Sequence, residues 1–81
     1  MHMGEIVEQL AVQVVEIRKR TLGEEHDSYA LALNNLAALY VDMGKRVKAE
    51  ELFMEVLDIR QRTLGEEDPR YATSLHNLAA L

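Results

Sequence analysis

Residues 14–39 read VVEIRKRTLGEEHDSYALALNNLAAL, and residues 56–81 read VLDIRQRTLGEEDPRYATSLHNLAAL. Aligned without a gap, the two stretches lie 42 residues apart and are identical at 17 of 26 positions. A repeat of this length is typical of solenoid proteins, in which each repeat buries its apolar face against its neighbours. Such chains usually present a binding surface, so we expect a scaffold for interactions and no catalytic chemistry.

Helical periodicity runs through the whole chain. Apolar residues recur at steps of three and four, the period of an α-helix, over residues 5–22, 27–43, 46–63 and 69–81. A single glycine follows each of the first three segments, as is common at the C-terminal ends of helices. No stretch shows the alternation of a strand, and the short connections force consecutive helices to lie antiparallel. The sequence therefore predicts an all-α fold of four antiparallel helices.

Helix ends and apolar faces can also be assigned. Asp27 or Ser28 is expected to cap the second helix, because both side chains accept hydrogen bonds from free backbone N–H groups. Asp68 followed by Pro69 predicts the start of the fourth helix, since proline has no N–H to leave unsatisfied there. The expected apolar faces are Val7, Leu10, Ala11, Val14, Val15 and Ile17; Ala30, Leu33, Leu36, Ala37 and Tyr40; Ala49, Leu52, Phe53, Val56, Leu57 and Ile59; and Ala72, Leu75, Leu78 and Ala79.

Composition narrows the function classes. A chain of 81 residues, of which 48% are hydrophobic, has room for a single domain. A net charge of −5 argues against nucleic acid, whose binding depends on Lys and Arg neutralising phosphates. The absence of cysteine excludes disulfides and thiolate metal sites and fits the cytoplasm. No apolar run approaches the ~20 residues of a membrane span. We interpret residues 1–4 as a cloning remnant.

No catalytic or metal-binding constellation is visible. The three histidines, His2, His26 and His76, lie far apart on different elements. No two of them have the spacing of four residues that places zinc ligands on one helical turn. The carboxylates are exposed by their pattern, so a general acid or base would lack a dry pocket to shift its pKa. We expect no catalytic residue, no metal and no cofactor.

The unit that begins at Asp27 resembles a tetratricopeptide repeat of the 42-residue kind found in kinesin light chains. The resemblance implies alternating helices A and B, and residues 5–22 align with the B helix at 47–64, so the helix order is B-A-B-A. Arg46 departs from the family pattern, which usually has an aromatic residue after Gly-Lys. The matching residues are Asn35-Leu36-Ala37, Tyr40, Gly44-Lys45, Ala49-Glu50, Leu52, Leu57, Ile59-Arg60 and Leu64-Gly65.

The resemblance also implies a concave groove, lined by the A helices, that binds extended peptides. Asn35 and Asn77 stand where relatives hold a peptide backbone with an amide; a hydrogen bond between helices is the alternative role. The face lacks the Lys or Arg that would clamp an acidic C-terminus. The groove candidates are Leu31, Asn34, Asn35, Ala38, Val41 and Asp42 of the first A helix, and Thr73, His76, Asn77 and Ala80 of the second.

The order B-A-B-A leaves the first and last helices without their natural neighbours. We therefore expect either a fragment of a longer array or a unit of an assembly. The leading interpretation is a non-catalytic module that binds a protein or peptide. The alternative is a structural unit in which neighbouring chains complete each other's repeats, in a head-to-tail array or a closed two-fold dimer. The candidates for this self-association are Leu75, Leu78 and Leu81 of the last helix and Val7, Leu10 and Val14 of the first.

Overall fold

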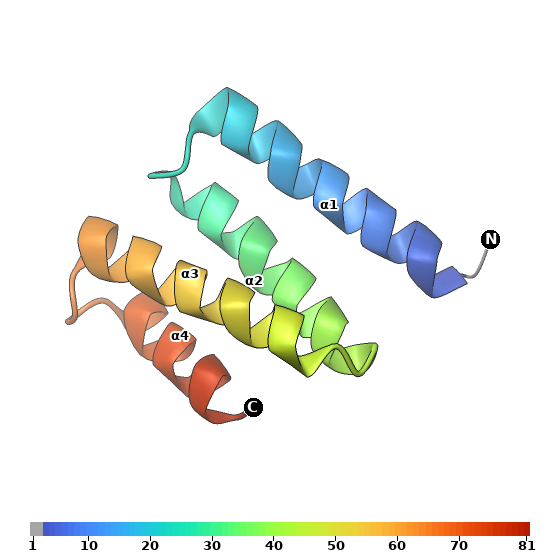
Figure 1. The fold of residues 1–81 in the computed structure, drawn as a ribbon. Helices are drawn as coiled ribbons and strands as arrows, with labels where there is room; N and C mark the ends of the chain where they lie inside the picture. Colours follow the sequence, from blue (N-terminus) through green and yellow to red (C-terminus); the bar gives the residue numbers. More distant parts are fainter. Residues whose placement is uncertain (1–2) are drawn as a thin grey trace.

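The computed structural model describes residues 3–81 and contains no strand within them. Four helices follow one another: α1 (Met3–Leu22), α2 (Asp27–Asp42), α3 (Arg46–Leu64) and α4 (Pro69–Ala79). Each helix packs against the next one along the chain, so α1 and α4 form the two outer edges (Figure 1). The predicted all-α fold is confirmed, and every helix end lies within two residues of its predicted position. Of the residues interpreted as a cloning remnant, 3 and 4 begin α1, and 1 and 2 lie outside the described part.

Equivalent residues of the two repeats shape the helix ends in the same way. Gly23 and Gly65 have φ angles of 89° and 86°, a left-handed conformation that side chains disfavour. The expected cap of α2 was wrong: His26 caps this helix, and its Nδ1 accepts a hydrogen bond from the Ser28 N–H at 3.0 Å. Asp27 is already the first helical residue. In α4 the predicted cap is confirmed, because Asp68 Oδ1 accepts from the Arg70 N–H at 2.8 Å.

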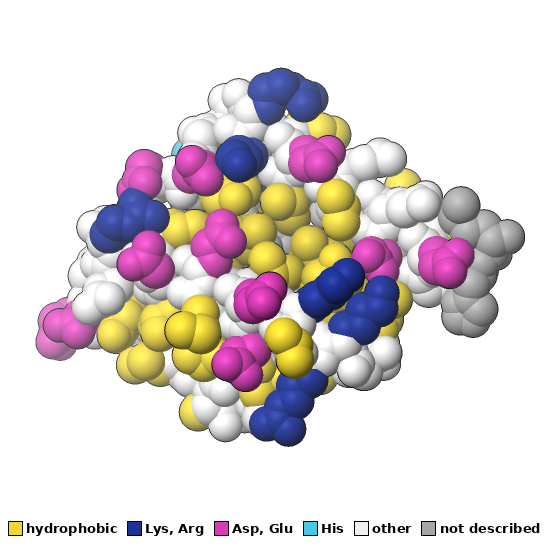
Figure 2. Space-filling view, in the orientation of Figure 1, with side chains coloured by type: hydrophobic (Ala, Val, Ile, Leu, Met, Phe, Trp, Pro, Cys, Tyr) yellow, Lys and Arg dark blue, Asp and Glu magenta, His cyan; other side chains and the backbone are white. Residues whose placement is uncertain are grey.

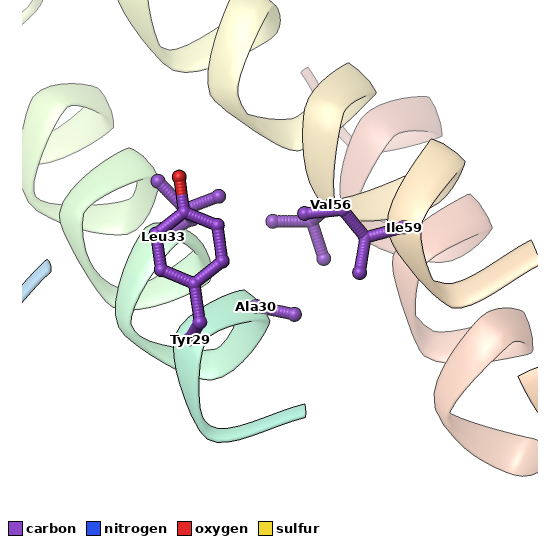
Figure 3. Packing of buried hydrophobic residues seen from close by; sticks show 5 residues of the cluster. All are labelled: Tyr29, Ala30, Leu33, Val56 and Ile59. Carbon is purple, nitrogen blue, oxygen red and sulfur yellow. The ribbon is translucent and has the colours of Figure 1, made fainter. Parts of the chain in front are cut away.

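The core lies mainly between α2 and α3 and forms two clusters. In the first cluster, Ala30 and Leu33 of α2 face Val56 and Ile59 of α3, with Tyr29 beside them (Figure 3). Small residues let the two helices approach closely, and the alanines of both clusters are completely buried. The tight fit therefore depends on side chains without bulk. The second cluster consists of Leu36, Ala37, Tyr40, Ala49 and Phe53.

The outer helices bury much less than the sequence suggests. α1 has no fully buried residue, and only its Ala11, Val12 and Val15 pack against the second cluster. The rest of its expected apolar face is exposed, because within residues 3–81 only α2 covers this helix. Hydrophobic side chains are also visible in the middle of the molecule over α2, with charged ones around them (Figure 2). The exposed apolar residues of α1 are Met3, Ile6, Val7, Leu10, Val14, Ile17 and Leu22.

The repeat provides a matched test of this difference in burial. Val56 is 0% exposed and its counterpart Val14 is 42% exposed. We expect Val56→Ala to lower the free energy of unfolding by about 2 kcal/mol, because it removes two packed methyl groups and leaves a cavity. Val14→Ala should change it by less than ~0.5 kcal/mol. Urea unfolding of both variants, followed by circular dichroism, measures the difference; equal losses would contradict the described packing.

Candidate functional site

A hollow of about 240 Å³ opens between α2 and α4. It is smaller than the ~300–1,000 Å³ of typical small-molecule sites. Half of its lining residues are alanine, valine or leucine, and Phe53 of α3 reaches it from the core. The full lining is Ala38, Val41 and Asp42 of α2, Phe53 of α3, and His76, Asn77, Ala80 and Leu81 of the C-terminal segment.

Some of the predicted groove residues line the hollow. Ala38, Val41, Asp42, His76 and Asn77 line it, together with Ala80, as the positions on the A helices suggest. Phe53 was missed because its helical position marks it as a core residue, which it also is, at 5% exposure. Leu81, a candidate for self-association, also lines the hollow. The groove candidates that lie outside the hollow are Leu31, Asn34, Asn35 and Thr73.

One hydrogen bond joins the two A helices beside the hollow. Asn77 Nδ2 donates to Asn34 Oδ1 at 3.0 Å. Of the two roles considered for Asn77, the helix–helix hydrogen bond is therefore present, and Asn34 is its partner. Asn35 is exposed. Sequence reasoning placed Asn34 and Asn77 on the same face, but it could not pair them, because their contact depends on how α4 packs beside α2.

A buried guanidinium holds α4 in this position. Arg60 of α3 is 4% exposed, and its Nε donates to Asp27 Oδ1 at 3.1 Å. Its Nη1 donates to the Arg70 carbonyl at 3.3 Å and to Ser74 Oγ at 3.1 Å. Arg70 Nη1 donates in turn to Asp27 Oδ2 at 3.4 Å. The cluster ties α2, α3 and α4 together, and it leaves no charge buried without a partner.

The self-association candidates fall into two groups. Val7, Leu10 and Val14 of α1 are exposed, and so is Leu75 of α4. Leu78 and Leu81 are half-buried and pack against the second core cluster, so they are not part of the exposed surface of α4.

The lining of the hollow contains one acidic residue. Asp42 lines the hollow, and no Lys or Arg does. Near the start of α4, the Arg70 side chain and backbone N–H hold the pKa of Asp68 below its usual range. On the opposite edge, the hydrogen bond from Lys45 lowers the pKa of Glu8, which also accepts from the Tyr40 hydroxyl at 3.3 Å.

Residues 3–81 hold no cluster of His, Cys, Asp and Glu suited to a metal ion.

Comparison with known families identifies the fold. The tetratricopeptide repeat family matches residues 8–60 and, in a second match, residues 28–81. The chain therefore belongs to the tetratricopeptide repeat family, whose members are typically non-catalytic modules that bind proteins or peptides. A search of curated proteins finds no match for this chain. None of the helices formed by residues 3–81 is both long and apolar enough to cross a bilayer.

The contribution of the Arg60 cluster to stability can be tested by replacing the Asp27 carboxylate with an amide of the same shape. We expect Asp27→Asn to lower the free energy of unfolding by about 2 kcal/mol, because it weakens two charge-assisted hydrogen bonds beside a buried guanidinium. Amide hydrogen exchange should show the loss first in α4. Glu25→Gln is the control, since it removes only the exposed pair with Arg62 and should cost less than ~0.5 kcal/mol. Equal effects in the two variants would be evidence against a tethering role for Arg60.

A second test uses the raised pKa of a core tyrosine. Burial, and then the nearby Glu55 carboxylate, raise the pKa of Tyr29 to about 12. An unfolded tyrosine loses its proton near ~10, so the unfolded state gains stability between these pH values. The free energy of unfolding should therefore fall as pH rises from ~10 to ~12, and Tyr29→Phe should make this fall less steep. Urea unfolding at several pH values measures it.

Glu55→Gln supplies the matching control for Tyr29. It keeps an acceptor for the Tyr29 hydroxyl, which donates to Glu55 Oε2 at 3.3 Å, and it removes the negative charge. Tyrosinate absorbance should then show a lower pKa for Tyr29. An unchanged titration in this variant would exclude the carboxylate as a cause.

Proposed function

We propose that this chain is a binding module whose hollow between α2 and α4 receives an extended peptide. The observation that carries the proposal is the combination of an apolar hollow with a neighbouring pair of asparagine amides. The hollow has room for one apolar side chain. Beside it, each amide of the Asn34–Asn77 pair can both donate and accept hydrogen bonds, as a peptide backbone requires. No reaction is assigned to the chain.

The lining also defines the preferred partner. Val41 is 44% exposed and, with Ala38 and Ala80, offers apolar contact to an anchoring side chain. Asp42 favours Lys or Arg next to that anchor. Because no Lys or Arg lines the hollow, an acidic peptide or a C-terminal carboxylate would find no permanent positive charge there. The proposed ligand is therefore an extended peptide with an apolar anchor beside a basic residue.

Other features of the chain are part of the same proposal. We assign the repeat to the 42-residue kind found in kinesin light chains, which is supported by the equivalent turns at Gly23 and Gly65. The absence of cysteine supports a cytoplasmic location. The excess of acidic residues argues against nucleic acid as a partner.

Self-association is the second candidate function. It is supported by the exposed apolar residues of α1 and by Leu75 of α4, which lie on the two outer edges of the molecule. Exposed apolar residues that recur along one face of a helix, as on α1, often mark an interaction site. The partner in this case would be another copy of the chain, and the groove would remain accessible.

The peptide proposal is tested with a positional-scanning array of short immobilised peptides. We expect selection of a large apolar residue next to Lys or Arg, and rejection of Asp and Glu. Val41→Glu should weaken binding of the selected peptide by about tenfold or more, because it places a charge in the apolar wall. Val47→Glu is the matched control: Val47 is 71% exposed, lies outside the hollow and should be neutral. Binding without sequence preference, or binding untouched by Val41→Glu, would refute the proposal.

A further inference from the structure

The exposed apolar face of α1 is a copy of a face that is buried elsewhere in the chain. Val14 and Ile17 are 42% and 48% exposed. Their counterparts one repeat later are Val56 and Ile59 of α3, the same residue types, at 0% and 2% exposure. The difference arises because α2 covers that face of α3, whereas within residues 3–81 no helix covers the corresponding face of α1.

The outer face of α4 is related to α2 in the same way. Leu75 is 45% exposed, whereas its counterpart Leu33 is 3% exposed. Ala72 is also exposed, whereas its counterpart Ala30 is completely buried. Tyr71 stands one repeat after Tyr29 and is half-buried. All three residues of α2 in the first core cluster therefore recur, with identical side chains, on the open side of α4.

Both halves of the first core cluster are thus present twice, once packed together and once apart. In the packed copy, Ala30 and Leu33 face Val56 and Ile59 (Figure 3). In the unpacked copy, the same side chains lie at opposite edges of one molecule, Val14 and Ile17 on α1 and Tyr71, Ala72 and Leu75 on α4. These two surfaces carry the residue types of the packed pair, and within one molecule α1 and α4 do not touch (Figure 1).

We propose that α4 of one copy packs on α1 of a second copy in the register of α2 on α3, so that the solenoid continues head to tail. This proposal rests on the self-association offered above as the second candidate function, and it is independent of the groove. The contact is heterologous, because each copy uses a different surface at each edge. A heterologous contact propagates into a linear array, or into a ring if the rotation closes.

Polar neighbours indicate how strong this contact is. The Tyr29 hydroxyl donates to Glu55, and at the junction the equivalent residues are Tyr71 and Gln13, which preserves an acceptor. The Arg60–Asp27 ion pair is not preserved, since the residues at the corresponding positions are Arg18 and Pro69.

The second core cluster is reproduced less closely than the first. Val7 stands in place of Ala49, and Ala11 in place of Phe53. We therefore expect an assembly that depends on concentration and is weaker than the packing of α2 on α3 within the chain.

Two charge substitutions and their mixture determine the mode of contact. Val14→Glu blocks the α1 surface, and Leu75→Glu blocks the α4 surface; both residues are exposed, so the fold of each copy is retained, which circular dichroism verifies. In sedimentation velocity, the unmodified chain should grow in mass with concentration. Each variant alone should stay monomeric. An equimolar mixture should form a dimer and stop there, because the intact α4 surface of the first variant meets the intact α1 surface of the second.

Other outcomes would overturn the proposal in distinguishable ways. A strict monomer for the unmodified chain would exclude self-association. A Val14→Glu variant that still dimerises alone would show a two-fold contact between α4 surfaces, and a dimeric Leu75→Glu variant would show one between α1 surfaces. Val47→Glu, the same type of substitution away from both edges, should assemble like the unmodified chain. Peptide binding in the groove by Leu75→Glu, measured on the same array, separates a failure of assembly from a failure of the proposed function.

Discussion

The fold depends on the close approach of α2 and α3. Completely buried alanines, Ala30 and Ala37 on one helix and Ala49 on the other, bring the two backbones together, and larger side chains fill the space on either side. Within residues 3–81, this central pair contains the fully buried hydrophobic residues, and α1 and α4 add half-buried side chains at its margins. Such nearest-neighbour stability is characteristic of repeat proteins.

Polar interactions determine the position of α4 relative to α2, which the hydrophobic core alone does not specify. The guanidinium of Arg60 lies between three helices and orients the start of α4 relative to α2. The Asn34–Asn77 hydrogen bond fixes the same two helices further along. Directional hydrogen bonds at two points therefore set the distance between α2 and α4, and with it the width of the hollow. The apolar contacts of Leu78 and Leu81 mainly stabilise the packing of this segment on the core.

The sequence alone predicted the helices, their order and the register of the repeat, because a period of 3.6 residues and a period of 42 are both visible without coordinates. It did not predict how deeply each apolar residue is buried. Val14 and Val56 have the same local pattern, and only the presence of a covering helix distinguishes them. Local sequence patterns are insufficient for the site as well. The spacing of Phe53 marks it only as a core residue, although it also lines the hollow. The pairing of Asn77 with Asn34 depends on the angle between α2 and α4, which no local pattern encodes.

The attachment of α4 has a thermodynamic consequence for the groove. The backbone of α4 approaches only α3, and it reaches α2 through a few side chains, so this helix can detach by local unfolding while the central pair stays intact. Because the hollow exists only when α4 is docked, any ligand held there binds the closed state and not the open one. Occupancy and docking are then linked, and a bound ligand stabilises α4 by an amount that grows with the logarithm of its concentration.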